Sequence, residues 1–236
     1  RADAIVVASK GHIEGSSYLD PYKDKCHVIP FGVEKKMEKR ADEYVKVKTV
    51  NSSSDIRFLF VGRLVYYKGC DVLLKAMSRV RGCQLDIVGE GPIRQDLERL
   101  ARQLEIMDRV TFFGEVADDI LDERFRACDV FVLPSVEKSE AFGIVQMEAM
   151  AYAKPVINTR LRSGVPYVSL DRITGITVEP KDENKLADAM NWLADHPEER
   201  ETYGQAAYKR IKEYFSQENM LRQLLTLYQN LTLEER

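Results

Sequence analysis

Residues 129–152 have the sequence DVFVLPSVEKSEAFGIVQMEAMAY, in which an apolar run, a charged loop and an amphipathic segment follow one another. The run from Asp129 to Pro134 is β-branched and aromatic and ends at a proline, which predicts a buried parallel strand. Residues 135–139 form a polar loop. From about residue 141 the apolar positions have the spacing of a helix that packs on a sheet. The stretch therefore predicts a strand–loop–helix unit with a site at the end of the strand.

Two carboxylates bracket the start of this predicted helix: Glu140 lies just before it and Glu148 about two turns inside. Eight residues at about 1.5 Å of rise each span roughly 12 Å, the scale of a ribose separated by a diphosphate from a sugar. The free N–H groups of Ala141, Phe142 and Gly143 would attract phosphate. The arrangement suits a nucleotide sugar, with Glu140 accepting from sugar hydroxyls and Glu148 from ribose hydroxyls.

The stretch resembles the E-x7-E signature of the retaining glycosyltransferase family four, whose members have the two-domain GT-B fold. Its context, S-x-x-x-S-E-A-F-G followed by E-A-M-A-x-x-K-P-V-I, is more specific than two glutamates, which alone would fit an exposed helix. The chain is also similar to bacterial and archaeal polysaccharide-assembly hexosyltransferases, and the resemblance implies a hexosyltransferase of glycan biosynthesis. It would move mannose, glucose or galactose from an NDP-sugar to a saccharide or lipid-linked acceptor, with retention and with no metal or cofactor.

A second motif, GRLVYYKG at residues 62–69, follows a predicted strand. Gly62 lets the backbone approach a ligand, and Arg63 and Lys68 can neutralise the two charges of a diphosphate. A solvated basic loop is the alternative. The motif matches the family's diphosphate clamp, and the resemblance implies catalytic roles: Arg63 and Lys68 stabilise the leaving diphosphate and Glu140 orients the hexose. A donor phosphate oxygen would serve as the base.

Two further stretches are less specific. Gly89 and Gly91 follow the next predicted strand and suggest close passage of the nucleotide, although a strand-to-helix turn explains them equally well. Residues 113–116 resemble the family's base-binding stretch, in which the backbone around Val116 pairs with the base. Uracil, guanine and adenine all stay open. Residues 163–175 resemble a loop of polysaccharide-building members, for which a structural role is favoured.

Short apolar strands alternate with helical patterns between residues 56 and 214. This alternation predicts an α/β fold, a Rossmann-like parallel sheet with helices on both faces, as in the C-terminal half of a GT-B fold. Ligands bind beyond the carboxyl ends of such strands. We predict that residues 1–54 are the end of an N-terminal acceptor domain plus a polar linker over 31–54. Residues 55–214 would be the donor-binding domain and 215–236 a C-terminal crossing helix.

Composition sets limits on the partners. A net charge of −3 gives no indication of nucleic-acid binding, and 44% hydrophobic residues fit a globular domain. We find no apolar run of 18 residues and no signal peptide, so we expect a cytoplasmic protein, with peripheral contact at the membrane face left open. The four cysteines have no metal-like spacing and are predicted to be reduced core thiols. The three histidines have no partner at metal-binding spacing and no Asp-x-Asp pattern appears in a strand-end loop, so we expect no metal site.

The chain begins at Arg1 with a strand-like run, which we interpret as the start of a fragment. The resemblance places acceptor recognition mainly in an N-terminal domain, so we expect these residues to bind the donor and to transfer little alone. Two alternatives stay open. One is a non-catalytic nucleotide-sugar-binding module, and the other is a GT-B nucleotide-sugar epimerase.

Overall fold

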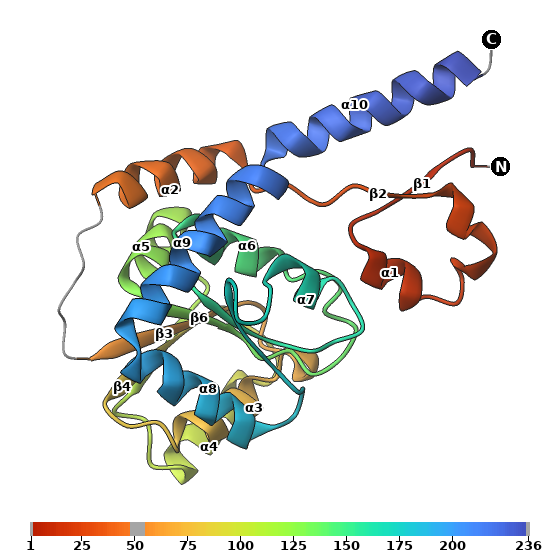
Figure 1. Ribbon diagram of the computed structural model, residues 1–236. Helices are drawn as coiled ribbons and strands as arrows, with labels where there is room; N and C mark the ends of the chain where they lie inside the picture. The colour runs from red at the N-terminus through yellow and green to blue at the C-terminus, as the bar shows by residue number, and fades with distance from the viewer. Residues whose placement is uncertain (1, 48–54, 235–236) are drawn as a thin grey trace.

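The computed structural model describes residues 2–47 and 55–234 (Figure 1). Within these ranges a parallel six-stranded sheet has the strand order β5-β4-β3-β6-β7-β8. Its strands are β3 (Ile56–Val61), β4 (Cys83–Val88), β5 (Val110–Gly114), β6 (Val130–Leu133), β7 (Val156–Thr159) and β8 (Gly175–Val178). The predicted α/β fold with a parallel sheet is confirmed.

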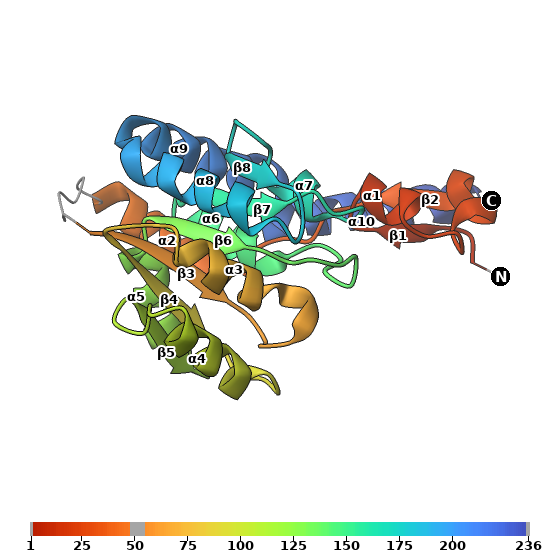
Figure 2. The same cartoon turned by 90° about the horizontal axis from the view of Figure 1, so that it is seen from below.

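Helices cover both faces of this sheet (Figure 2). They are α3 (Cys70–Met77), α4 (Arg94–Gln103), α5 (Asp118–Ala127), α6 (Ile144–Ala151), α7 (Val165–Val168), α8 (Glu183–Asp195) and α9 (Pro197–Tyr214). Side chains of β3 alternate between two cores: Phe58 and Phe60 pack with α3, α4 and α8, and Leu59 packs with α5, α6 and α9. Burial of each such side chain contributes about 1.5–3 kcal/mol, so both helical layers are held by the strands.

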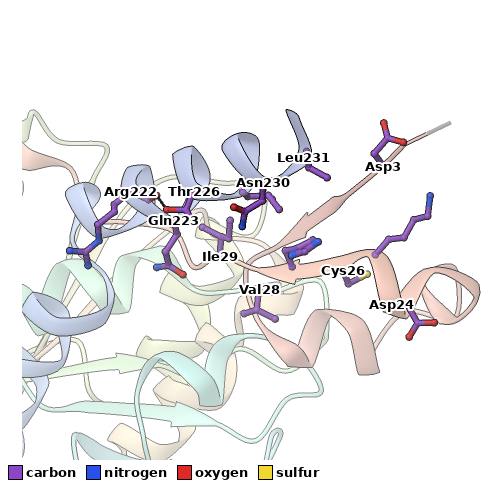
Figure 3. Close-up of a pocket in the computed structure, with 13 residues that line it drawn as sticks. Asp3, Asp24, Cys26, Val28, Ile29, Arg222, Gln223, Thr226, Asn230 and Leu231 are labelled. Carbon is purple, nitrogen blue, oxygen red and sulfur yellow. Dashed lines mark hydrogen bonds between the residues drawn. The ribbon is translucent and has the colours of Figure 1, made fainter. Parts of the chain in front are cut away.

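The first residues form a smaller unit of their own. Strands β1 (Ile5–Val7) and β2 (Cys26–Val28) pair in parallel and are joined by α1 (Lys10–Glu14) and a 3-10 helix, η1 (Asp20–Lys25). The last helix, α10 (Gln217–Glu234), leaves the large sheet and runs beside this unit (Figure 1). A cavity of about 810 Å³ lies between α10 and β2, with Arg222, Thr226 and Asn230 along its helical wall (Figure 3).

The polar linker predicted over residues 31–54 is wrong for its middle part, which is the helix α2 (Lys35–Val47). Met37, Ala41 and Tyr44 recur at helical spacing and pack on the core beside α6, and Ala41 is fully buried. The remaining positions are mostly charged, which is why the stretch resembles a linker. Residues 48–54 lie outside the described residues.

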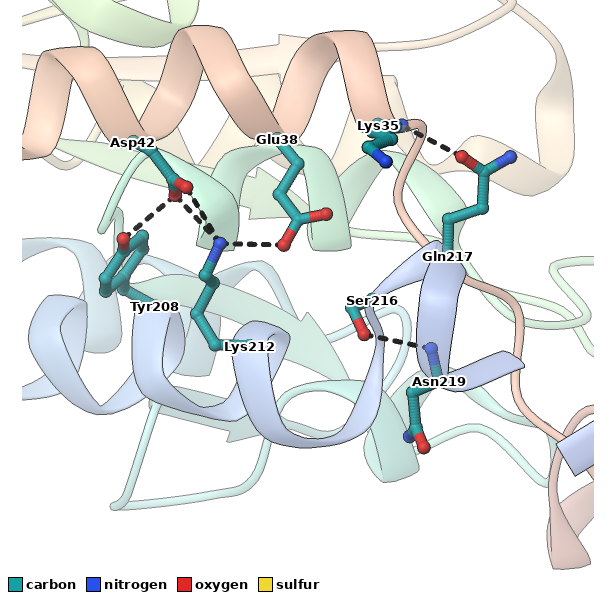
Figure 4. A network of polar contacts seen from close by, with 8 residues as sticks. All are labelled: Lys35, Glu38, Asp42, Tyr208, Lys212, Ser216, Gln217 and Asn219. Carbon is teal, nitrogen blue, oxygen red and sulfur yellow. Dashed lines mark hydrogen bonds and ion pairs between the residues drawn. The ribbon is translucent and has the colours of Figure 1, made fainter. Parts of the chain in front are cut away.

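Two crossings join the small unit to the large sheet, and they touch each other. Val33 forms a parallel bridge with Ser216, and its N–H donates to the carbonyl of Phe215 over 2.8 Å. Beyond this point α2 lies against α9, where Lys212 Nζ is 2.7 Å from a Glu38 oxygen and 2.9 Å from an Asp42 oxygen (Figure 4). The segment through which the chain enters the large domain is therefore in direct contact with the segment through which it leaves.

Cys70, Cys83 and Cys128 are buried free thiols, as predicted, whereas Cys26 is partly exposed beside the cavity of Figure 3. Burial raises the pKa of Cys83 to about 11 and that of Cys128 to about 12, so both thiols stay protonated at neutral pH. Within the described residues, no helix is both long and apolar enough to cross a bilayer.

Candidate functional site

The predicted site residues meet at one edge of the sheet, beyond the carboxyl ends of adjacent strands. The loops at residues 62–69 and 135–143 follow β3 and β6, which are neighbours in the sheet. The loops at 89–91 and 114–116 follow β4 and β5 on the other side of β3. Because all these strands are parallel, residues up to 80 positions apart in sequence lie along a single edge.

The loop after β3 is tied to the loop after β6. A 3-10 turn, η2 (Tyr66–Lys68), ends at Gly69, which has a left-handed φ of 70°. A Cβ atom at Gly69 would overlap the carbonyl oxygen of Pro134, so only glycine allows this close approach. The N–H of Val136 donates to the carbonyl of Tyr67 over 2.8 Å. These contacts bring Lys68 to the loop that carries Glu140.

Lys68 and Glu140 form an ion pair. The distance between Lys68 Nζ and Glu140 Oε2 is 2.5 Å, and their side chains are only 12% and 9% exposed. The hydroxyl of Ser135 donates to the same carboxylate oxygen over 2.9 Å. Thr159 in turn holds the backbone of Ser135, donating to its carbonyl over 2.5 Å. The two groups that the sequence assigns to the diphosphate and to the sugar are thus direct partners.

Ala141, Phe142 and Gly143 precede α6 and do not form its first turn, because the helix begins at Ile144. Gly143 has a left-handed φ of 71° and precedes the first helical residue, so the predicted helix start near residue 141 is three residues too early. Among the described residues, nothing accepts a hydrogen bond from the amides of Ala141, Phe142 or Gly143. Three free N–H groups before a helix attract an anion.

A buried polar network supports this loop, and the sequence did not indicate it. Gln146 is fully buried, and its amide donates to the carbonyls of Phe142 and Val165 over 3.0 and 3.2 Å. Asn158 donates to the Gln146 side chain over 3.2 Å and accepts from Thr177 over 2.7 Å. The signal was a glutamine within the apolar run of α6. Such a residue stays buried only if its amide is fully bonded.

Arg63 is the exposed cation of the site. No described side chain or carbonyl forms an ion pair or hydrogen bond with its guanidinium, in contrast to Lys68. A guanidinium with five unused N–H donors can bind two phosphate oxygens at once. The structure therefore leaves Arg63 available for an anion at the same strand end as Lys68.

The glycines after β3 and β4 have a packing role. A Cβ atom at Gly89 would overlap the carbonyl oxygen of Gly62, and one at Gly91 would overlap that of Leu64. Leu64 also donates its N–H to the carbonyl of Glu90 over 2.8 Å. Close packing of the two loops is sufficient to explain these glycines, and their contact with a nucleotide stays a prediction.

Glu148 lies within α6, half-buried, and its carboxylate makes no hydrogen bond or ion pair with any described residue. Burial raises its pKa, and the nearby carboxylate of Glu34 raises the pKa further. A carboxylate kept half-buried without a donor is costly for folding, which is typical of groups that bind a ligand. Val116 lies partly buried between β5 and α5, and pairing of its backbone with a base stays a prediction.

Comparisons with known proteins identify the family and the fold of the chain. The sequence profile of the family described as "Glycosyl transferases group 1" matches residues 42–210. The chain belongs to this family of glycosyltransferases. It is 34% identical over 229 residues to the O-antigen chain mannosyltransferase C of Escherichia coli, covering 97% of this chain and 61% of that protein. It is also 34% identical over 220 residues to the D-rhamnosyltransferase WbpZ of Pseudomonas aeruginosa, covering 91% and 56%.

Solved structures show the same fold. Sucrose-phosphate synthase from Thermosynechococcus elongatus superposes with a TM-score of 0.83 at 29% identity, over 99% of this chain and 59% of that one. Anabaena Alr3699/HepE, solved in complex with UDP, gives 0.85 at 19% identity, over 97% and 64%. This glycosyltransferase domain therefore has the GT-B type of fold, and the chain spans about three fifths of the length of these proteins.

Proposed function

We propose that this chain is the nucleotide-sugar-binding part of a retaining glycosyltransferase of glycan biosynthesis. The transferred sugar would be mannose, glucose or galactose, and the acceptor a saccharide or a lipid-linked saccharide. The observation that carries the proposal is the Lys68–Glu140 pair beside the free amides of residues 141–143. Similarity to a mannosyltransferase and a rhamnosyltransferase supports the reaction class, and a related fold solved with UDP-glucose supports the donor class.

The leaving diphosphate would bind where positive charge collects. Arg63 binds it as a planar fork, Lys68 as a point charge, and the amides before α6 share the remaining charge. All these groups are in place before the reaction, so they stabilise negative charge as the sugar–phosphate bond breaks. Metal ions are not needed in this scheme. Lys68 must then divide its N–H donors between Glu140 and the diphosphate.

Glu140 would orient the hexose through its hydroxyls, with Ser135 holding the carboxylate in place. A phosphate oxygen of the donor takes the proton of the acceptor hydroxyl, so Glu140 is not a nucleophile. Glu148 would accept from the ribose, and its half-buried position without a donor supports this role. The backbone near Val116 would pair with the base. The whole reaction would take place in the cytoplasm, with acceptor contacts supplied by an N-terminal domain.

Calorimetric titration with GDP-mannose, UDP-glucose, UDP-galactose and UDP-N-acetylglucosamine tests the proposal. One donor should bind, and Lys68→Ala and Glu148→Ala should each weaken it by about tenfold or more, because each removes a hydrogen bond to a charged group. Lys209→Ala is the matched control, since Lys209 is 75% exposed on α9. Failure of all four donors to bind would contradict the proposal.

A non-catalytic binding module would give the same titration, so turnover separates it from an enzyme. In the longer protein, Arg63→Ala and Lys68→Ala should each lower kcat by orders of magnitude on a saccharide acceptor. Turnover close to that of the unmodified protein would show that neither residue stabilises the leaving group. Epimerisation of the nucleotide sugar without an acceptor would favour the other alternative.

A further inference from the structure

Helix α1 reaches the loop that precedes α6. Figures 1 and 2 both place α1 next to α7 and away from the strands of the large sheet. The imidazole of His12 stacks on the Phe142 ring, with centroids 6.1 Å apart and planes inclined by 29°. His12 Nδ1 is 2.9 Å from the hydroxyl of Ser9, which is fully buried. The small N-terminal unit thus contacts the proposed phosphate loop through an oriented ring.

Phe142 is held on several sides. It is 3% exposed and also lies near the rings of Phe31, at 5.3 Å, and Phe215, at 6.2 Å. A Cβ atom at Gly164 would overlap the Phe142 ring, and the N–H of Gly164 donates to the carbonyl of Ala141 over 2.6 Å. The aromatic side chain is therefore clamped between the two units of the chain.

The packing of this ring restrains the backbone that carries the neighbouring amides. The peptide units on both sides of Phe142 are planar. A change in the backbone dihedral angles of Phe142 therefore also turns the N–H groups of Phe142 and Gly143. Those amides are free in this structure and lie next to Glu140. His12 is the member of the clamp whose own orientation is fixed by a side-chain hydrogen bond, to Ser9. Burial lowers the pKa of His12, which favours the neutral ring in this contact.

We propose that His12, oriented by Ser9, is a positioning residue that holds Phe142 and so aims the amides of Phe142 and Gly143 at the diphosphate. The inference rests on the proposed function for the identity of the anion. It adds a specific task for the small N-terminal unit, which would help to build the donor site across the boundary between the two units.

Nucleotide binding tests this role with a readout that a general loss of stability would not produce. UDP and GDP are compared with UMP and GMP by calorimetry on this chain. His12→Ala should weaken the bound diphosphate by roughly three- to tenfold, the loss expected for one aromatic pair, and the monophosphate by less than about twofold. His12→Phe keeps the stacked ring and should restore most of the affinity. His196→Ala is the matched control, because His196 stacks on Trp192 at 4.5 Å outside the site.

Amide hydrogen exchange of the unliganded chain provides a second measurement. His12→Ala should accelerate exchange of the peptide covering residues 140–146 by about threefold or more, with no change in β3 or β4. Unchanged exchange and unchanged diphosphate affinity would overturn the inference and leave the proposed function intact. Equal losses for His12→Phe and His12→Ala would also overturn it, since an aromatic ring at position 12 would then not be what supports Phe142. Lack of any nucleotide binding by the unmodified chain would refute the proposed function, while the exchange experiment would still test the positioning of the loop.

Discussion

The Lys68–Glu140 pair allows a quantitative test of how the site is built. At 2.5 Å and an effective dielectric constant of about 20, the charges attract by about 7 kcal/mol, and desolvation offsets most of this. Removal of one partner of a buried pair costs about 3–5 kcal/mol. Ser135 continues to donate to Glu140 in Lys68→Met, so we expect a loss at the lower end, about 3 kcal/mol. Glu140→Gln should cost about 2 kcal/mol, since its amide oxygen can still accept.

A double-mutant cycle isolates the pair. Urea unfolding followed by circular dichroism should give a loss of about 3 kcal/mol for the double variant, against about 5 for the sum of the singles, hence a coupling near 2 kcal/mol. Arg160 and Glu179 provide the control pair, because they are 2.9 Å apart but 55% and 64% exposed. Their coupling should stay below about 1 kcal/mol. A coupling under about 0.5 kcal/mol for Lys68 and Glu140 would refute the assignment of this pair as a buried, interacting unit.

Two further predictions concern Glu148 and Lys154. Because burial and Glu34 raise the pKa of Glu148, the folded chain binds this proton more tightly than the unfolded chain, and stability falls as pH rises through the interval between the ordinary and the raised pKa. Glu148→Gln should therefore raise the melting temperature at pH 7 but not at pH 4. Equal melting temperatures of the variant and the unmodified chain at pH 7 would contradict this. The nucleotide affinity of the variant should still fall about tenfold. Lys154 is buried and donates to the carbonyls of Arg126 and Cys128 and to the Tyr44 hydroxyl. Lys154→Met should therefore lower the free energy of unfolding in urea by about 3 kcal/mol. A loss below about 1 kcal/mol would show that these acceptors find other partners.

The parts of the fold that repeat a simple period were predictable. The strand at residues 56–61 and the helix at 118–127 belong to the alternating pattern predicted between residues 56 and 214, because each is a short apolar or amphipathic run between clear boundaries. Helix α2 was missed because its buried face consists of only three apolar positions, Met37, Ala41 and Tyr44, in an otherwise charged stretch. The start of α6 was placed too early because the left-handed turn at Gly143 cannot be seen in the apolar pattern.

The site was predictable to the level of which loops meet. Parallel strands bring their carboxyl ends to one edge, so Arg63, Lys68 and Glu140 were expected along the same edge of the sheet. Their pairing was not predictable, since it depends on the overlap-free contact between Gly69 and Pro134 in three dimensions. The Gln146 network and the His12 contact also join segments far apart in sequence, and neither has a motif of its own.

The contact between α2 and α9 has a consequence for the order in which the chain folds. Asp42 and its hydrogen-bond partner Tyr208 are 166 residues apart in sequence. The bridge between Val33 and Ser216 likewise joins two segments that are far apart in sequence. At a synthesis rate of about 5–20 residues per second, roughly 10 to 30 s pass between the appearance of α2 and that of the helix it binds. During this interval the apolar face of α2 has no α9 beside it. The first helix of the large domain thus gains its partner only when nearly the whole chain has been made. Such distant closure favours slow folding and leaves apolar surface of the nascent chain uncovered in the meantime.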